Sequence, residues 1–176
     1  NDSTDRLMIP GPVEVEADVL AAIGHQVVPH YGPQWVPVYR DVQSNLKHVF
    51  HTTGDVFVIP GSGSAGVDAV LGSLLRPGDA CLVTVNGFFG ERLSAIAQSR
   101  GAQVSEVRAE WGQPVLVEQV RAALDRQEGF QAVCVVHHET STTALNPVRE
   151  ISALASEYGV PLVVDAISSL GGEALD

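Results

Sequence analysis

Short apolar runs alternate with amphipathic stretches along the chain from Asp55 onward. Each run is rich in valine, leucine or isoleucine, and in the stretch that follows it apolar residues recur every three or four positions. The runs predict strands over 56–59, 81–85, 103–107, 132–136 and 161–164, and the stretches predict helices over 64–75, 89–99, 115–126 and 148–158. Because apolar strands separated by helices are typical of parallel sheets, the pattern predicts an α/β fold, a mainly parallel sheet with helices on both faces.

The N-terminal part of the chain follows a different pattern. A helix is predicted over 15–23, and a second is predicted over 38–50, where apolar residues keep helical spacing. Between them, residues 25–37 form a loop that is rich in proline, histidine and aromatic side chains but poor in charge. We therefore expect residues 1–50 to form an N-terminal arm with helices, and residues 51–176 to form the α/β domain.

The turn after the first predicted strand is built from small residues, G-S-G-S-A-G at 61–66. A strand, a glycine turn and a helix in this order leave backbone N–H groups free at the helix N-terminus, where the helix dipole is positive. Such a terminus suits a phosphate, and the hydroxyls of Ser62 and Ser64 add donors. The alternative is a tight turn that binds nothing.

The same glycines spell G-x-G-x-x-G, the spacing found in dinucleotide-binding turns. Those sites also need an acid at the end of the next strand, for the ribose hydroxyls, but here neutral Asn86 follows that strand. A nucleotide-hydrolase loop would need Gly-Lys followed by Ser or Thr, which this loop lacks. The pattern favours a phosphorylated ligand other than NAD.

Polar and aromatic residues follow several predicted strands at their carboxyl ends, the edge where parallel sheets bind ligands. They are N-G-F-F-G at 86–90, H-H-E-T-S-T at 137–142, and Asp165, which closes an apolar strand. A charge there is costly unless it is paired, so Asp165 is a candidate ligand-binding residue; the alternatives are a helix N-cap and a metal ligand. His137 and His138 are adjacent on a strand and point to opposite faces, so they make a poor chelate and we expect no metal.

Composition narrows the choice of partners. The 176 residues are 45% hydrophobic, enough for a real core, and the formal net charge of −11 argues against nucleic acid and anionic membrane surfaces. No apolar run reaches membrane-spanning length, and the first residues do not resemble a signal peptide. Cys81 and Cys134 lie in apolar strand-like runs, where we expect two buried free thiols. These features indicate a soluble, cytoplasmic protein.

A phosphate site, an aromatic face and a carboxylate at one sheet edge together suit pyridoxal 5'-phosphate, a phosphorylated ring with a protonatable nitrogen. Over nearly the whole chain the motifs resemble, in order, those in the N-terminal half of class V, fold-type-I aminotransferases, in particular the alanine–glyoxylate and serine–pyruvate group. The motifs that carry the resemblance are I-P-G-P at 9–12, G-S-G-S-A-G at 61–66, N-G-F-F-G at 86–90, H-H-E-T-S-T at 137–142 and L-V-V-D-A-I-S-S-L-G-G at 162–172. The resemblance implies a pyridoxal phosphate enzyme with the large-domain fold of that family.

By position, the resemblance implies that the loop cradles the cofactor's phosphate through Ser62, Gly63 and Ser64. Phe89 would stack on the cofactor ring, where the family often has tryptophan, with Phe88 beside it facing the core. Thr140 matches a hydroxyl near the cofactor's phenolic oxygen. Ser64 departs from the family, since some members have histidine there.

Two further roles follow from the resemblance. Asp165 would pair with the cofactor's pyridine nitrogen and keep it protonated, and together with Phe89 it is an implied catalytic residue. Gly11 would approach the substrate carboxylate from the arm. Tyr31 and Thr143 stand where the family often has arginine and glycine, and these departures leave the choice of substrate open.

The implied activity is transamination between a small amino acid, alanine or serine, and a small 2-oxo acid, glyoxylate or pyruvate. The resemblance also implies a homodimer whose interface the N-terminal arm helps to build. One alternative is a desulfurase or lyase of the same fold, although those relatives usually place a histidine over the ring, where this chain has Phe89. Another is a non-catalytic nucleotide-binding α/β domain that uses only the glycine loop.

The chemistry implied by the resemblance also needs a Schiff-base lysine. The only lysine is Lys47, which precedes the predicted sheet. In the family that lysine, and an arginine for the substrate carboxylate, come later than the position of Asp176. We therefore expect the chain to be part of a longer polypeptide, with the rest of the large domain and a small domain outside it.

Overall fold

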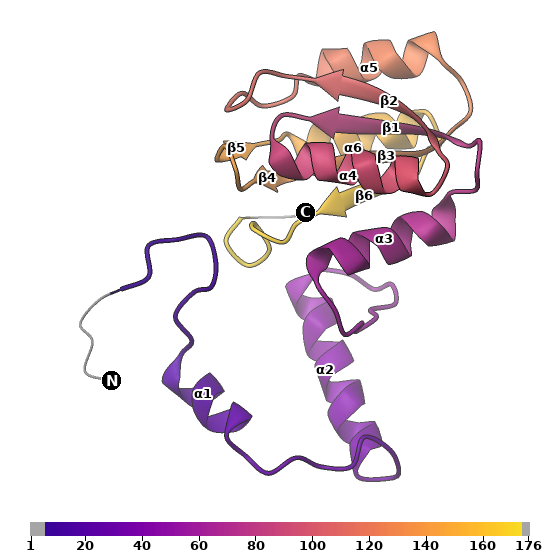
Figure 1. The fold of residues 1–176 in the computed structure, drawn as a ribbon. Coiled ribbons are helices and arrows are strands. Elements are labelled where there is room, and N and C mark those ends of the chain that lie inside the picture. Colours follow the sequence, from indigo (N-terminus) through magenta and orange to yellow (C-terminus); the bar gives the residue numbers. More distant parts are fainter. Residues whose placement is uncertain (1–5, 174–176) are drawn as a thin grey trace. The chain divides into compact units, whose positions relative to one another are not determined.

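The computed structural model describes residues 6–173, and the chain divides into two compact units. The first unit comprises the residues up to 48 together with 52–57, and the second comprises 49–51 and the residues from 58 onward. Figure 1 labels the helices and strands of both units. No helix among the residues described is long and apolar enough to cross a membrane.

The first unit is built on two helices, α1 (Ala17–Ile23) and α2 (Trp35–Val49). Both occur near their predicted positions, but α2 begins earlier than expected and includes Pro37. Proline is tolerated in the first turn of a helix, because the N–H that it lacks would have no intrahelical partner there. The proline-rich loop is therefore shorter than the sequence predicts.

Of the described residues in the first unit, only Val56 is buried. Gln43 Nε2 donates a hydrogen bond to the Val56 carbonyl at 2.9 Å, which fixes the segment 52–57 to α2. Most other apolar side chains of the unit are exposed, for example Met8 at 90% and Val27 at 84%, while Trp35, Tyr39 and Leu46 are partly buried. It therefore has almost no hydrophobic core of its own.

The second unit is built on a four-stranded sheet in the order β2-β1-β3-β6. Its strands are β1 (Ala80–Val85), β2 (Gln103–Arg108), β3 (Phe130–Val136) and β6 (Leu162–Asp165). Each pair of neighbours runs parallel, so the carboxyl ends of all four strands meet at one edge. The predicted α/β fold with a parallel sheet is confirmed.

Helices cover both faces of this sheet (Figure 1), namely α3 (Gly63–Leu74), α4 (Phe88–Ser99), α5 (Val117–Arg126) and α6 (Val148–Glu157). Successive side chains of β1 enter two separate cores: Leu82 packs with residues of α5 and α6, whereas Cys81 and Val83 pack with residues of α3 and α4. Cys134 of β3 joins the second core, and its sulfur lies 3.5 Å from that of Cys81. Both thiols are free and buried, as expected.

The prediction of a strand over residues 56–59 is wrong. In the part of the chain that the structure describes, these residues pair with no other strand, and Phe57 is 76% exposed. A β-type run becomes a strand only beside a hydrogen-bonding neighbour, and the described sheet ends at β2 and β6. The segment therefore runs irregularly toward α3.

A small antiparallel hairpin, which the hydrophobic pattern does not predict, follows β3. It pairs β4 (His138–Glu139) with β5 (Ala144–Leu145). Its turn holds Thr143 in the left-handed region, at φ 59°. That conformation is strained for a β-branched residue, which is a physical reason for the glycine frequent there in the family that the motifs resemble.

Candidate functional site

The N-terminus of α3 presents two free backbone donors. Ser62 is the N-cap residue, and its Oγ accepts a hydrogen bond from the N–H of Ala65 at 3.3 Å. The N–H groups of Gly63 and Ser64 have no acceptor among residues 6–173. Together with the positive end of the helix dipole, these two amides make the predicted loop a suitable place for a phosphate group.

Gly63 also determines what lies beside these amides. A β-carbon built at Gly63 would come within 1.9 Å of Cδ1 of Ile167, so only glycine leaves room for that side chain. Ile167 lies two residues after Asp165, in the turn that follows β6. The absence of a side chain at Gly63 therefore brings the α3 N-terminus against the carboxyl end of β6.

Asp165 is the last residue of β6, at the carboxyl edge of the sheet. Its Oδ1 accepts a hydrogen bond from the Ile167 N–H at 3.1 Å, so one oxygen stabilises the turn. Because a turn and not a helix follows β6 among the described residues, Asp165 is not a helix N-cap there. Its Oδ2 accepts no hydrogen bond from the residues that the structure describes. That oxygen remains available to a ligand.

One cavity joins these elements and measures about 130 Å³. Its lining includes Gly63, Ser64, Phe89, Asp165, Arg92 and Ile167. The last two were not predicted, although their spacing gave a signal: Arg92 lies one helical turn after Phe89, and Ile167 lies two residues after Asp165. Small-molecule sites usually measure about 300–1,000 Å³, so these residues form one wall of a site and do not enclose it.

Phe89 lines the cavity, whereas Phe88 does not face the core. Phe89 packs against the core on the side of α3 and α4, whereas Phe88 is 49% exposed, so the prediction that Phe88 faces the core is wrong. The reason is helical geometry, since Phe89 shares the inner face of α4 with Leu93 and Ile96. The two rings meet edge to face, with centroids 5.3 Å apart. Phe89 can therefore offer a well-supported ring surface to the cavity.

Thr140 lies close to the turn after β6, but it does not line the cavity. Its hydroxyl hydrogen-bonds to the hydroxyl of Ser168, three residues after Asp165. The nearby His137 makes two further links: its N–H donates to the Asp165 carbonyl at 2.8 Å, and its Nδ1 lies 2.9 Å from Ser169 Oγ. The loop after β3 and the turn after β6 are therefore joined by three polar contacts.

His137 has a structural role in this arrangement. It is buried, and burial lowers the pKa of its ring below the ordinary value, which favours the neutral form. Neutral imidazole suits the contact with the Ser169 hydroxyl. The buried ring therefore helps to join the loop after β3 to the turn after β6.

Glu139 is a buried acid that no pattern in the sequence singled out. It is 0% exposed, and its carboxylate accepts hydrogen bonds from the N–H groups of Phe89 (3.3 Å), Gly90 (3.0 Å) and Ser141 (3.1 Å), and from the Ser141 hydroxyl (2.6 Å). The α4 residues are about fifty positions away in the sequence. Local spacing therefore could not reveal this contact.

Asn86 has a structural explanation. It is buried at the end of β1 and exchanges amide hydrogen bonds with Asn146, at 3.0 and 3.1 Å. Its amide also donates to the carbonyl of Gln113 at 2.9 Å. A neutral side chain engaged on both sides cannot replace the acid that dinucleotide sites require, so the structure supports the argument against NAD.

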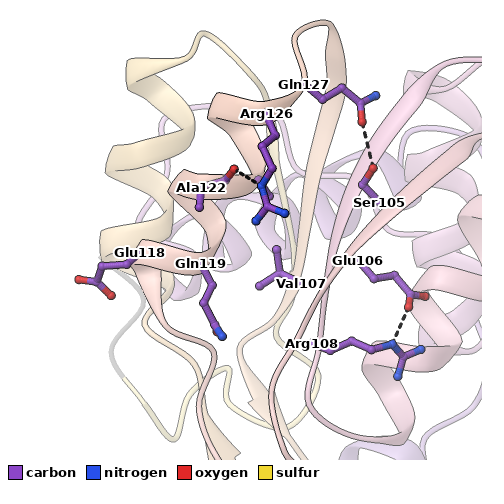
Figure 2. Close-up of a pocket in the computed structure, with 10 residues that line it drawn as sticks. Ser105, Glu106, Val107, Arg108, Glu118, Gln119, Ala122, Arg126 and Gln127 are labelled. Atoms are coloured by element: carbon purple, nitrogen blue, oxygen red, sulfur yellow. Dashed lines mark hydrogen bonds and ion pairs between the residues drawn. The ribbon is translucent and has the colours of Figure 1, made fainter.

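A larger cavity, of about 590 Å³, lies between β2 and α5 (Figure 2). None of the predicted site residues line it. Arg108 is paired with Glu106 at 2.7 Å, and Gln127 accepts a hydrogen bond from Ser105 at 3.1 Å. Because these groups already have partners and the site chemistry lies elsewhere, size alone does not make this groove the functional site.

Gly11 belongs to the first unit, whereas the cavity belongs to the second. Its assignment to the substrate carboxylate stays a prediction. The assignments of Ser62, Gly63, Ser64, Phe89, Thr140 and Asp165 to a cofactor are also predictions, which the geometry above makes physically reasonable.

Comparison with known proteins identifies the family. The family described as aminotransferase class-V matches residues 16–176. An uncharacterized aminotransferase from Methanocaldococcus jannaschii is 39% identical over 167 residues, which are 95% of this chain and 43% of that protein. The (S)-ureidoglycine–glyoxylate transaminase of Bacillus subtilis is 32% identical, over 94% of this chain and 40% of that protein.

Solved structures of similar fold indicate the same family. The alanine–glyoxylate aminotransferase of Nostoc sp. has a TM-score of 0.91 and 33% identity, and the match covers 99% of this chain and 47% of that structure. The chain thus spans less than half the length of the relatives it matches. The resemblance drawn from the motifs is confirmed, and the chain belongs to the class V aminotransferase family.

Proposed function

We propose that the whole protein is a pyridoxal phosphate-dependent aminotransferase. It transfers the amino group of a small amino acid, alanine or serine, to a small 2-oxo acid, glyoxylate or pyruvate. The observation that carries this proposal is the cavity that brings together the free amides of the α3 N-terminus, the Phe89 ring and the Asp165 carboxylate. The relatives named above for glyoxylate support the choice of a small 2-oxo acid.

The residues present fit pyridoxal phosphate, the cofactor of class V aminotransferases. The N–H groups of Gly63 and Ser64 would bind the phosphate, since no other residue described takes them. Phe89 would hold the ring by offset stacking, worth about 0.5–1.5 kcal/mol beyond the burial of area. Asp165 has a free oxygen for the pyridine nitrogen. Thr140 lies outside the cavity lining and its hydroxyl bonds to Ser168, so it would reach the phenolic oxygen only from the rim of the site.

When bound, pyridoxal phosphate supplies an electron-accepting ring that stabilises the charge left when the α-carbon of an amino acid loses its proton. The task of Asp165 is to hold a proton at the ring nitrogen, because a nearby carboxylate favours the positively charged form of that nitrogen. Phe89 would keep the ring plane fixed, and Ile167 lies against Gly63 beside the phosphate amides. These residues bind and orient; the lysine for proton transfer is expected elsewhere in the protein.

A homodimer is part of the proposal. The first unit exposes apolar and aromatic side chains such as Ile23 (73%) and Tyr31 (71%) and buries almost nothing. Apolar surface of this kind is typical of interfaces, so we assign residues 1–50 to an arm that meets a second copy of the chain, and residues 51–176 to the cofactor-binding domain. Buried free thiols fit a reducing compartment, which supports a cytoplasmic location.

Two alternatives have less support. A desulfurase or lyase of the same fold is less consistent with Phe89 over the ring and with relatives named as aminotransferases. A nucleotide-binding domain lacks an acid in place of Asn86, which is engaged with Asn146. Both alternatives can be separated from transamination by experiment.

The test is a titration of the full-length protein with pyridoxal phosphate, followed by assays with alanine, serine and cysteine as donors. We expect saturable binding and amino transfer from alanine or serine to glyoxylate or pyruvate. Release of sulfide from cysteine without amino transfer would instead indicate a desulfurase. Absence of cofactor binding together with nucleotide binding would refute the proposal.

A further inference from the structure

We propose that Glu139 is a positioning residue, whose buried carboxylate holds the Phe89 ring and the Thr140 hydroxyl in one fixed arrangement for the cofactor. The inference rests on the proposed function, because it concerns the same site. Glu139 itself is fully buried and does not line the cavity, so it acts through its neighbours. No charged group lies in hydrogen-bonding distance of it among residues 6–173, which makes its backbone partners decisive.

Glu139 contacts the N-terminus of α4. The carboxylate accepts the N–H of Phe89 at 3.3 Å through Oε1 and that of Gly90 at 3.0 Å through Oε2. These are orphan donors of the first helical turn, where a negative charge is also favoured by the helix dipole. Because Phe89 is itself one of the two residues held, the position of its ring depends directly on this carboxylate.

Glu139 also contacts the loop that carries Thr140. Oε1 of Glu139 also accepts the N–H of Ser141 at 3.1 Å and its hydroxyl at 2.6 Å. The Ser141 hydroxyl in turn accepts the N–H of Phe88 at 2.9 Å. Thr140, between Glu139 and Ser141, is thereby enclosed in a network that ends on the first three N–H groups of α4.

Gly87 leaves space for the Glu139 carboxylate. A β-carbon at Gly87 would lie 2.4 Å from Cγ of Glu139 and 2.6 Å from Oγ of Ser141. The backbone of Gly87 is extended, so it is the lack of a side chain, and not an unusual conformation, that the site requires. A hydrophobic side chain at 139 would leave the N–H donors of α4 buried without partners, which costs free energy of folding. Packing alone therefore does not explain an acid at this position.

Thr140 also hydrogen-bonds to Ser168, in the turn after Asp165. The same loop therefore connects three groups with expected roles at the cofactor: the ring of Phe89, the hydroxyl of Thr140 and the turn of Asp165. The Glu139 carboxylate accepts four hydrogen bonds, two from α4 and two from the loop that carries Thr140, and so fixes the position of these two segments relative to each other. A solvent-exposed helix cap would not provide this.

The variant that tests the proposal is Glu139→Gln in the full-length protein, which keeps the shape but places an amide donor against backbone donors. The matched control is Glu106→Gln. Glu106 also anchors α4 by its carboxylate, which accepts a hydrogen bond from Ser94 Oγ, but at the middle of the helix and away from the cavity. Three quantities are measured for each: the melting temperature without cofactor, the dissociation constant of pyridoxal phosphate, and the visible circular dichroism per bound cofactor.

We expect Glu139→Gln to weaken pyridoxal phosphate binding by about tenfold or more, the change that follows from losing one charge-assisted hydrogen bond. We also expect it to change the circular dichroism at saturation, because the ring is held in a different orientation. Glu106→Gln should lower the melting temperature without moving either cofactor signal. Ser141→Ala, a milder change at an exposed residue, should shift both cofactor signals in the same direction, and it carries the test if Glu139→Gln does not fold.

The inference is overturned if Glu139→Gln and Ser141→Ala bind the cofactor with parental affinity and dichroism, or if Glu106→Gln changes these signals as much for an equal loss of melting temperature. Either result would make Glu139 an ordinary structural acid. Failure of the parent protein to bind pyridoxal phosphate would instead overturn the proposed function. The two failures are therefore distinguishable.

Discussion

At the scale of single residues, the two oxygens of the Asp165 carboxylate have different contacts. Oδ1 accepts the N–H of Ile167 and stabilises the turn after β6, while Oδ2 has no partner among the residues described. The sequence predicts both the position and the importance of this acid, because a charge that closes an apolar strand at the ligand edge requires a partner. The structure adds that the turn contact uses only one of the two carboxylate oxygens.

Asp165→Asn separates the turn contact from the proposed contact with the cofactor. The amide oxygen still accepts the N–H of Ile167, so the full-length variant should fold with a loss of at most about 1 kcal/mol in stability. Because a neutral amide does not favour a protonated ring nitrogen, kcat/KM for transamination should fall by orders of magnitude. Asp165→Ala should lose both the turn contact with Ile167 and the activity. Near-normal turnover in either variant would contradict the role of Asp165.

Thr143 offers a test of backbone strain. Its φ of 59° lies in the left-handed region, which costs a residue with a β-carbon about 1–2 kcal/mol, while glycine loses about 0.5–1 kcal/mol in chain entropy. Thr143→Gly should therefore stabilise the protein by about 0.5–1 kcal/mol in urea unfolding. The control is Thr142→Gly, which should destabilise it, since Thr142 has no positive φ and its hydroxyl donates to the Asn86 carbonyl. Destabilisation by Thr143→Gly would show that the hydroxyl or methyl of Thr143 matters more than the strain.

What the sequence could not predict at this scale depends on long-range contacts. Phe89 and Asp165 were found because they follow strands whose carboxyl ends converge. Glu139 was missed because its partners on α4 are about fifty residues away, and a buried acid in a polar motif looks like any solvated acid. Phe88 was misplaced because two adjacent aromatic residues at a helix start do not reveal which one faces inward.

At the scale of elements, the α3 N-terminus is the part of the site whose geometry is most tightly determined. Gly63→Ala would place a β-carbon against the Ile167 side chain, so one of them must move. We expect the dissociation constant of pyridoxal phosphate to rise by about tenfold or more, since the free amides lose their alignment.

Gly66→Ala is the matched control for that prediction. Gly66 lies in the same glycine motif and within α3, but a β-carbon there would meet nothing within 4 Å. Alanine should stabilise the helix by about 0.5–1 kcal/mol and leave cofactor affinity unchanged. Equal affinities for Gly63→Ala and Gly66→Ala would contradict the assignment of the phosphate to this helix end.

Most elements of the second unit agree with the hydrophobic pattern, because buried parallel strands and amphipathic helices are distinguishable by period. The exceptions have physical causes. The run at 56–59 has strand-like residues but lacks a ladder partner among the described strands, and β4 and β5 are too short for a period to show. The early start of α2 reflects the tolerance of a helix for proline in its first turn.

At the scale of the whole molecule, the contrast between the two units is the informative feature. The second unit has two cores, one on each face of its sheet, whereas the described part of the first unit buries only Val56. A segment that exposes so many apolar side chains is not stabilised by its own packing. This is the physical basis for proposing a subunit interface there.

Removal of residues 1–37 from the full-length protein tests that proposal. We expect sedimentation to show loss of the dimer, and pyridoxal phosphate to bind more weakly even though Ser62, Gly63 and Ser64 are intact. The control is a variant that keeps the arm but carries Glu106→Gln, which should remain dimeric. A truncated monomer that retains the cofactor as tightly as the parent would show that arm and cofactor site are independent.

The proposed function depends most on Asp165 holding a proton at the cofactor's ring nitrogen. The most direct measurement is the ¹⁵N chemical shift of that nitrogen in ring-labelled pyridoxal phosphate bound to the full-length protein and to Asp165→Asn. We predict the shift of a protonated pyridinium in the parent at neutral pH, and the shift of a neutral pyridine in the variant. The same shift in both proteins, or a neutral pyridine in the parent, would contradict the assignment of the site.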